Sequence, residues 1–430
     1  MSSGDDSAQT QVVAMKPAIG RQISILYAIH YPVFGGPHNG ALRLSPVLES
    51  YGVKTTVLLP KSQGNAKERL RAGGVEVVDM ALHRLRATVH PLEHLRFGLG
   101  FLPEVQAIRR MIRERNVNIV QVGGLVNPHA AIAAKLEGVP VVWQLLDTRP
   151  PMALRRLIMP LVARLADSVM YAGGELITVH PGADRLKDRN FVFFPPVDVS
   201  LFRPDSADKK SARLELGIPA GTPVVGMVAN VNPQKGHEYF IRAAALIRRE
   251  RPEARFLVVG AFHETHTRYG ERVRDLAREL GVLDATVFTG SRDDVQRMFQ
   301  AMDVSLITSV PHSEGTTTTA MESMACGVPV VATDVGAVAE VVDDGVTGHV
   351  VPPLDPEAIA EATLRLLRDP DQRERMGRAG RQAAVERFSV ERCAETHLRA
   401  YDYALRRKGR PALLRDEQDP AHAWPTERAA

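Results

Sequence analysis

The sequence of 430 residues predicts an α/β protein made of two Rossmann-like domains, each with a doubly wound parallel sheet, that face each other across a cleft. Three observations predict this class. The chain is roughly three times as long as a common domain, so a single hydrophobic core is not expected. Short apolar runs alternate with helix-like stretches, and these runs are hydrophobic on both faces, as in parallel strands covered on two sides. The alternation stops and restarts near residue 200, which gives two series.

The first series begins at residue 20. Strands are expected at Ile23–Ala28, Thr55–Leu59, Ile119–Val122, Val139–Trp143 and Ser168–Tyr171, and helices at Asn39–Ser50, Glu104–Arg115 and Pro128–Glu137. Residues 20–198 are therefore predicted to form the N-terminal domain. Residues 1–19 are polar and mixed in charge, so they are predicted to be disordered.

The second series follows a boundary at Pro195-Pro196-Val197-Asp198. Strands are expected at Pro223–Val228, Arg255–Val259, Thr286–Thr289, Val304–Thr308 and Val330–Thr333, and helices at His237–Arg249, Glu271–Leu280, Asp293–Ala301, Thr317–Ala325 and Asp355–Arg368. Residues 199–389 are predicted to form the C-terminal domain. Residues 390–408 are expected to form a last helix that packs back toward the first domain, and residues 409–430 a disordered tail.

Composition excludes several classes of protein. Hydrophobic residues make up 44% of the chain and charged residues 24%, so wholesale disorder and a collagen-like or disulfide-rich chain are not expected. The two cysteines, Cys326 and Cys393, are too few and too far apart for a disulfide framework or a structural zinc site, and they fit a reducing compartment. No apolar run reaches the length of a signal peptide core or a membrane span. A cytoplasmic location, peripheral to the membrane at most, is expected.

Positive charge is concentrated in the first domain. Residues 1–198 hold 23 Lys and Arg against 16 Asp and Glu, whereas the whole chain has a net charge of only +4. This suits an anionic partner such as a phosphate or an anionic lipid surface, although a plain solvated surface is an alternative. Aromatic residues are only 5% and form no stacking motif, so no nucleic-acid partner is expected. Basic and apolar residues alternate in Leu154–Val162; with Arg84, Arg86 and Arg96 this segment predicts either a peripheral contact with an anionic membrane or a buried interdomain helix.

Loops after strands are the expected binding sites, because parallel sheets bind ligands at the carboxyl ends of their strands. The segment Phe34–Gly40 precedes a helix and contains Gly35 and Gly36, which suits the close approach of an anion but is also typical of a tight turn. Its spacing is not that of a dinucleotide-binding loop. The segment Ala229–Gly236 carries Lys235 just before a helix, where an ammonium group suits a phosphate; a solvated lysine is the alternative.

The segment Ser313–Glu322 is the strongest candidate. It joins two glutamates, Glu314 and Glu322, to a predicted helix start. Amides at the helix start would meet a phosphate, and the carboxylates would accept hydrogen bonds from sugar or ribose hydroxyls. A capped helix with two solvated glutamates explains the pattern equally well.

Six motifs occur in a fixed order after residue 196. They are Val197-Asp198 with Phe202-Arg203-Pro204, Gln234–Gly236, Phe288–Val295, Glu314-x7-Glu322, Met324–Ala332 and Gly345–Gly348. In order and spacing they resemble the second domain of the family 4 retaining glycosyltransferases, which are nucleotide-sugar enzymes of the GT-B fold. The first domain is similar more weakly, through Gly35-Gly36 and its general pattern of strands and helices. The resemblance implies a GT-B fold for nearly the whole folded chain.

The resemblance also implies residue roles. Lys235 and Glu314 would be catalytic: Lys235 would offset charge developing on the leaving diphosphate, and Glu314 would hold hydroxyls of the transferred sugar. Glu322 would hold the ribose. The residues implied to bind the donor are Gly35, Gly36, Asn230, Lys235, Ser291, Arg292, Glu314, Gly315, Thr316, Thr317, Thr318 and Glu322.

Two departures from the family pattern stand out. Asn230 occupies a position where many members have an arginine, so Lys235 alone or another cation, with Arg43 and Arg149 as candidates, would meet the diphosphate. Gln144 occupies the place of a first-domain histidine. Gln144, Asp147 and His129 are expected on the acceptor side, with a structural role as the alternative for His129.

The resulting hypothesis is a glycosyltransferase that moves a sugar from a nucleotide-sugar donor to a saccharide or lipid-linked acceptor with retention of configuration. Neither a metal nor another cofactor is expected, because Asp369-Pro370-Asp371 is typical of a turn and His263 and His266 have no third ligand nearby. A nucleotide-sugar 2-epimerase of the same architecture and a non-catalytic nucleotide-sugar sensor are the alternatives.

Overall fold

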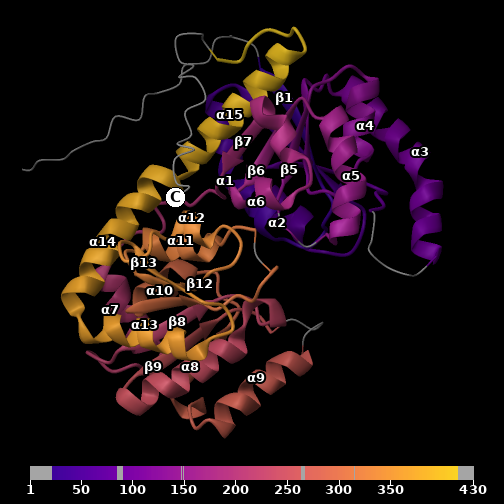
Figure 1. Ribbon diagram of the computed structural model, residues 1–430. Coiled ribbons are helices and arrows are strands. Elements are labelled where there is room, and N and C mark those ends of the chain that lie inside the picture. The colour runs from indigo at the N-terminus through magenta and orange to yellow at the C-terminus, as the bar shows by residue number, and fades with distance from the viewer. Residues whose placement is uncertain are drawn as a thin grey trace, which may run out of the picture.

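The computed structural model describes residues 22–84, 91–146, 148, 150–262, 267–313 and 315–414, with the backbone alone for residues 91–94. The described chain forms two lobes, each built on one parallel sheet with helices on both faces (Figure 1). The predicted fold class of two doubly wound α/β domains is confirmed. The predicted disordered N-terminus lies outside the described residues.

The first sheet has seven strands in the order β3-β2-β1-β4-β5-β6-β7, and every neighbouring pair is parallel. The strands are β1 Ile23–Ile29, β2 Val53–Pro60, β3 Glu76–Met80, β4 Ile119–Gly123, β5 Val141–Leu145, β6 Ser168–Ala172 and β7 Asn190–Phe193. The helices are α1 Gly36–Ser50, α2 Ala66–Ala72, α3 Pro91–Glu114, α4 His129–Leu136, α5 Met152–Leu165, α6 Glu175–Val179 and the 3-10 turn η1 Ala183–Arg189. The strand order reverses direction between β1 and β4, which is where a doubly wound sheet opens a crevice for ligands.

The second sheet has six parallel strands in the order β10-β9-β8-β11-β12-β13. The strands are β8 Val224–Val228, β9 Arg255–Val259, β10 Thr286–Gly290, β11 Val304–Ile307, β12 Val330–Thr333 and β13 Gly348–Val351. The helices are α7 Ser206–Glu215, η2 Pro233–Lys235, α8 His237–Glu250, α9 Thr267–Glu279, η4 Leu283–Ala285, α10 Val295–Ala301, α11 Thr318–Ala325, α12 Val338–Val341, α13 Pro356–Arg368 and α14 Pro370–Arg387. Its order reverses between β8 and β11, so each lobe offers a crevice of the same kind.

The C-terminal helices cross from one lobe to the other (Figure 1). Phe388 at the end of α14 packs in the core of the second lobe, whereas α15 (Val390–Arg407) buries Leu398 and Tyr401 in the core of the first. Beyond this helix, the backbone N–H groups of Leu413 and Leu414 donate to Asp402 at 2.5 and 3.0 Å, and both leucines are buried. Residues 409–414 therefore differ from the disordered tail expected from residue 409 onward, and residues 415–430 lie outside the described part.

The main differences from the predicted elements have physical causes. The unexpected strands β3, β7 and β13 are all edge strands, and half-exposed edges lack the two hydrophobic faces by which the inner strands were found. The strand expected at Val139–Trp143 begins only at Val141. Pro140 has no N–H to give to the ladder, and its carbonyl oxygen accepts from the Val120 N–H at 2.9 Å. Helix α3 begins at Pro91, well before the expected Glu104, and it continues through Pro103 although proline disfavours a helix interior.

Four buried histidines predict that the fold loses stability in acid. Burial lowers the pKa of His30, His129, His237 and His397 from 6.5 to about 4. Between these values the unfolded chain binds more protons than the folded chain, so each histidine removes about 1.4 kcal/mol of unfolding free energy per pH unit below 6.5. Urea unfolding at pH 7.5, 6 and 5 should show this steep loss. A flat profile for the wild type would contradict the prediction.

Candidate active site

A cavity of about 1110 Å³ lies between the two lobes. On the side of the first lobe it is lined by the loops that follow β1, β2 and β3, by the ends of β4, β5 and β6, and by one face of α1. On the side of the second lobe it is lined by Lys235 and by the segment that leads into α11. Both sheets therefore present the carboxyl ends of their strands to one space, which is large enough for two substrates together.

The loop after β1 forms the first wall. Gly35 is the N-cap of α1, and its N–H donates to Nδ1 of His38 at 3.1 Å, while Nε2 of the same ring lies 2.9 Å from the carbonyl oxygen of Tyr31. A Cβ atom added at Gly35 or Gly36 would meet no protein atom within 4 Å, because both face the cavity. The fold itself thus does not require glycine here, and the open space they leave is available to a ligand.

The loop after β8 brings Lys235 to the cavity. Lys235 ends η2, and Gly236 then adopts a left-handed conformation with φ of 64°, from which α8 starts. Glycine is required at Gly236, since a Cβ atom there would lie 1.9 Å from the carbonyl oxygen of Thr308. The Thr308 hydroxyl is 3.0 Å from the carbonyl oxygens of both Lys235 and Gly236, and the Val310 N–H donates to Gln234. These bonds join the Lys235 loop to the loop that leads toward α11.

The start of α11 lies in the same cavity. Gly315, Thr316, Thr317, Thr318 and Thr319 all line it, and Thr317 is the N-cap. The first N–H groups of a helix have no partner within it and carry its partial positive charge, so this end is suited to an anion. The Thr316 hydroxyl donates to the carbonyl oxygen of Ala172 in the first lobe, which fixes the segment across the interface. The structure thus places Lys235 and the predicted amides of Gly315–Thr318 opposite Gly35 and Gly36.

Glu322 is buried in α11 and pairs with the other lobe. Its Oε1 accepts a hydrogen bond from the Arg43 guanidinium of α1 at 2.9 Å, and the two side chains are 9% and 16% exposed. Burial raises the pKa of Glu322, and the charge of Arg43 opposes this rise. Arg43 also donates to the carbonyl oxygen of Pro196 at 2.8 Å and lies 5.4 Å from the Phe202 ring centre. Arg43, one of the two cations suggested to meet a diphosphate, is therefore held by a carboxylate; the other, Arg149, lies outside the described residues.

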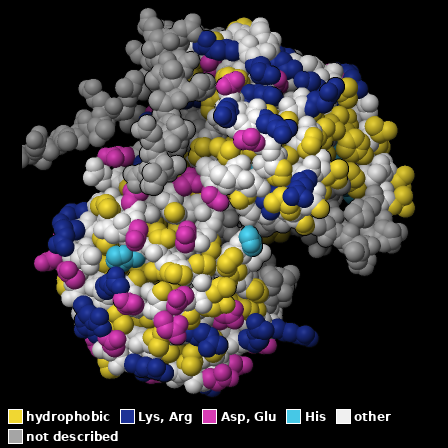
Figure 2. Space-filling view, viewed as in Figure 1, with side chains coloured by type: hydrophobic (Ala, Val, Ile, Leu, Met, Phe, Trp, Pro, Cys, Tyr) yellow, Lys and Arg dark blue, Asp and Glu magenta, His cyan; other side chains and the backbone are white. Residues whose placement is uncertain are grey.

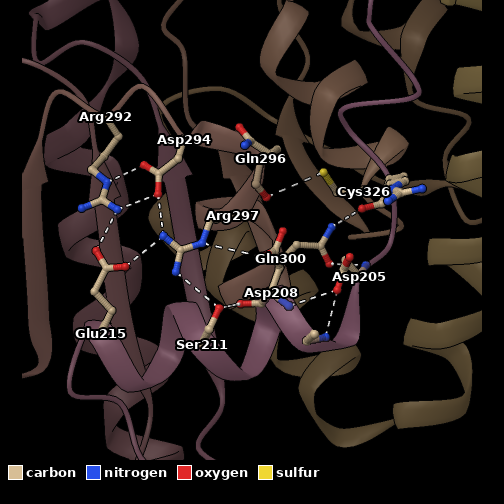
Figure 3. A network of polar contacts seen from close by, with 12 residues as sticks. Asp205, Asp208, Ser211, Glu215, Arg292, Asp294, Gln296, Arg297, Gln300 and Cys326 are labelled. Atoms are coloured by element: carbon tan, nitrogen blue, oxygen red, sulfur yellow. Dashed lines mark hydrogen bonds and ion pairs between the residues drawn. The ribbon is translucent and has the colours of Figure 1, made fainter.

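Four of the described donor residues do not line the cavity: Glu322, which is buried in α11, and Asn230, Ser291 and Arg292. Oδ1 of Asn230 accepts from the Ala261 N–H at 3.2 Å, which turns the side chain toward the loop after β9. Arg292 bonds both oxygens of Asp294 at 2.7 Å and Glu215 at 2.8 Å, in the network of Figure 3. These two carboxylates raise the pKa of Arg292. Ser291, its neighbour, lies in the same loop after β10.

The floor of the cavity is a chain of buried polar groups. The Tyr27 hydroxyl donates to Oε1 of Gln144 at 2.7 Å, and Nε2 of Gln144 lies 2.9 Å from Nε2 of His397. Because burial lowers the pKa of His397 to about 4, this ring is neutral and its Nε2 accepts from Gln144, while its Nδ1 donates to the Cys393 carbonyl oxygen at 2.8 Å. The predicted acceptor-side residue Gln144 thus lies on the floor of the cavity.

The other acceptor-side candidates lie elsewhere. His129 is fully buried at the start of α4, between the rings of Phe97 and Phe101, and its Nδ1 lies 2.7 Å from Oδ1 of Asn127. The structure does not bring it to the cavity, which agrees with the structural alternative. Asp147 and Glu314 lie outside the described residues, as do His263 and His266.

Several cavity residues were missed in the sequence. They are Tyr27, His30, Lys61, Arg84, Gln121, His397 and Tyr401. Lys61 follows β2 directly, which was a usable signal, but Arg84 follows β3, which was not recognised as a strand. His397 and Tyr401 reach the cavity from α15, which is far from it in sequence.

Two absences hold for the described residues. No group of three or more His, Cys, Asp or Glu side chains gathers in them as metal ligands would. None of the described helices is long and apolar enough to cross a bilayer.

The sequence of the second lobe is similar to those of known glycosyltransferases. Residues 208–383 match the family model described as "Glycosyl transferases group 1". The chain is 36% identical over 214 residues to the "D-inositol 3-phosphate glycosyltransferase" of Segniliparus rotundus, and 37% identical over 228 residues to the protein of the same name from Nocardia farcinica. These matches cover 49% and 52% of this chain but only 46% and 49% of the relatives, about half their length.

Two solved structures share the whole two-lobed architecture. Anabaena Alr3699/HepE in complex with UDP superposes with a TM-score of 0.76 at 22% identity, over 88% of this chain and 99% of that one. Sucrose-phosphate synthase from Thermosynechococcus elongatus superposes with a TM-score of 0.70 at 19% identity, over 88% of this chain and 98% of that one. The chain has the GT-B fold.

Proposed function

We propose that the protein is a glycosyltransferase of the family 4 type, which transfers a sugar from a nucleotide-sugar donor to an acceptor with retention of configuration. One observation carries the proposal: Lys235 and the start of α11 face Gly35 and Gly36 across a single interlobe cavity. A cation and a helix N-terminus that converge on a space form a site for a diphosphate. The matched glycosyltransferase segment, residues 208–383, contains both.

The proposed chemistry is electrostatic. As the bond between sugar and diphosphate breaks, negative charge grows on the leaving phosphate, and Lys235 with the amides of Gly315–Thr318 stabilises it where it forms. Glu314 holds hydroxyls of the transferred sugar, and Glu322 holds the ribose through Oε2, the carboxylate oxygen that does not accept from Arg43. The acceptor, a saccharide or a lipid-linked saccharide, enters from the first lobe over the floor made by Tyr27 and Gln144. No metal or other cofactor takes part in this scheme.

UDP-sugars are the first donors to test. HepE was crystallised with UDP and with UDP-glucose, and the relatives are named as glycosyltransferases. Thermal shift with UDP-, GDP- and ADP-sugars should show a rise in melting temperature for one base, because a ligand of the native state stabilises it. Release of nucleoside diphosphate that depends on an added acceptor would then establish transfer. Conversion of the donor alone into its epimer would overturn the proposal in favour of an epimerase, and binding without any turnover would favour a sensor.

We also propose that the first lobe rests on an anionic membrane. In α3, Leu95, Leu99 and Leu102 are 56%, 70% and 69% exposed, and their spacing puts them on one helix face. Leu157 of α5 is 70% exposed and follows Arg156. The visible face of this upper lobe carries mainly basic side chains around its hydrophobic ones, whereas acidic and basic side chains mix over the lower lobe (Figure 2). Exposed apolar groups ringed by cations suit an anionic bilayer surface.

Flotation with liposomes tests the membrane contact. The wild type should float with acidic liposomes at low salt and be released at high salt, because lipid charge attracts the basic face. The variant Leu99→Glu/Leu102→Glu should float at least tenfold less. Leu214→Glu is the matched control, since Leu214 is 82% exposed but lies on α7 of the second lobe. Equal flotation of both variants, or none of the wild type, would refute the contact.

A further inference from the structure

The first lobe contributes two cationic side chains to the cavity wall that are not assigned to binding the donor. Lys61 and Arg84 both line the cavity, and neither forms an ion pair with a described carboxylate. All the described lining residues are neutral or basic: none of them is Asp or Glu. The described lining of this wall therefore presents a positive potential to a ligand in the cavity.

The fold brings the two cations to the ends of neighbouring strands. Lys61 directly follows β2 and Arg84 lies four residues after β3, and these neighbouring parallel strands pair in register at Pro60 and Met80. The Lys61 N–H donates to the Met80 carbonyl oxygen at 2.7 Å, which ties the two strand ends together. The Arg84 guanidinium lies 5.0 Å from the ring centre of Tyr31, which also lines the cavity. Stacking on a ring leaves the edge of the guanidinium, with its N–H groups, free to bind.

Nearby carboxylates are already occupied. Asp79 at the end of β3 bonds the Lys67 ammonium group at 2.8 Å, away from the cavity lining. Glu104, buried in α3, accepts from the His83 backbone N–H at 3.0 Å and from the His83 ring, and lies 3.4 Å from Nε2 of His129. The charge of Lys61 contributes to the lowered pKa of Asp79, but the ion pair of Asp79 is made with Lys67, and Glu104 contacts His83 and His129 rather than Arg84.

The position of the pair separates it from the donor. The strand order β3-β2-β1-β4 puts the ends of β2 and β3 on the far side of the loop after β1, whereas the donor diphosphate is assigned to Lys235 and α11 in the other lobe. A nucleotide sugar has one diphosphate, and it would be held by the Lys235 site. A second anionic group in this cavity would therefore belong to the second substrate.

We propose that Lys61 and Arg84 bind a phosphate group carried by the acceptor, as a planar guanidinium and an ammonium group do together. The inference rests on the proposed function and names its acceptor class: a phosphate ester rather than a neutral saccharide. Two sources share this chemistry, a soluble sugar phosphate and a lipid-linked sugar phosphate. Specificity arises because a neutral analogue would forgo both charge-assisted contacts.

Binding measurements test the site before any acceptor is known. Glucose 6-phosphate, glucose and inorganic phosphate are titrated by calorimetry into protein saturated with UDP. Glucose 6-phosphate and phosphate should bind and glucose should not, and binding should weaken with salt. The variants Lys61→Met and Arg84→Met should each weaken phosphate binding at least tenfold, with UDP affinity unchanged. Lys210→Met, an exposed lysine on α7, is the control and should bind phosphate as the wild type does.

Each outcome of these measurements either supports or overturns the phosphate site. Absence of phosphate binding, or phosphate binding unaffected in both variants, overturns the site; loss of UDP affinity in the variants would reassign Lys61 and Arg84 to the donor. Phosphate binding that depends on Lys61 in a protein that binds no nucleotide would sink the proposed function while leaving the anion site intact. A polyprenyl-phosphate sugar in detergent micelles that binds at least tenfold tighter than glucose 6-phosphate would assign the phosphate to a lipid-linked acceptor, and the reverse order to a soluble one. Circular dichroism spectra of the variants should match the wild type, because Lys61 is exposed and Arg84 only half-buried.

Discussion

Lys235→Ala should lower kcat for sugar transfer by roughly 10²–10³-fold while leaving the fold intact. The side chain lies at the cavity wall after η2, and its charge is proposed to stabilise a leaving diphosphate that is more negative in the transition state than in the bound donor. Removal of one such preorganised group typically costs that factor. The loss should appear mainly in kcat, because part of the donor's binding comes from α11 and the base. Initial rates at saturating UDP-sugar measure it.

Two further variants sharpen this test. Lys235→Arg keeps the charge but changes its geometry, so it should retain more activity than alanine. Lys210→Ala removes an exposed lysine on α7 that does not line the cavity, so this variant should be as active as the wild type. A Lys235→Ala enzyme with unchanged kcat would mean that the diphosphate binds elsewhere, and the proposed donor site would be lost with it.

Inner strands of both sheets were predictable from sequence, whereas three of the four edge strands were not; the exception is β10, which was expected at Thr286–Thr289. Both faces are buried in the inner strands Val224–Val228 and Ile23–Ile29, so each appears in the sequence as a run of apolar residues. Glu76–Met80 is an edge strand and mixes acids with valines, which no periodicity rule separates from a loop. This omission also affected the predicted site. Because β3 was not recognised as a strand, Arg84 was not expected in a loop that follows a strand.

Local motifs located the donor wall, but contacts between distant segments could not be predicted. Gly35, Lys235 and Gly315–Thr318 each follow a strand, and the fold brings them to one cavity because parallel strands end at one edge. The pairing of Arg43 with Glu322 spans 279 residues, and that of Gln144 with His397 spans 253. Such pairs depend on how the two lobes and α15 pack, which a linear pattern does not contain.

The ion pair between Arg43 and Glu322 leads to the second large prediction: Arg43→Met should destabilise the protein by about 3–5 kcal/mol at neutral pH. It removes the cation from a buried carboxylate, and an uncompensated buried charge costs that much. It also removes a hydrogen bond to Pro196, in the segment that joins the lobes. Urea unfolding measures the loss. Donor affinity should fall as well, because Glu322 is then no longer held in place.

The pH dependence distinguishes the lost charge pair from lost packing. Burial already raises the pKa of Glu322 above 4.5, and without Arg43 it rises further. Above 4.5 the folded variant then holds a proton that the unfolded chain has released, so its stability falls as pH rises and returns as pH falls. The difference in unfolding free energy between Arg43→Met and wild type should therefore shrink from pH 7.5 to pH 5.5, and the buried histidines cancel in this difference. The double variant Arg43→Met/Glu322→Gln should recover much of the loss at pH 7.5, since no charge remains to be buried. A penalty that is independent of pH and persists in the double variant would instead assign the effect of Arg43 to its packing on Phe202.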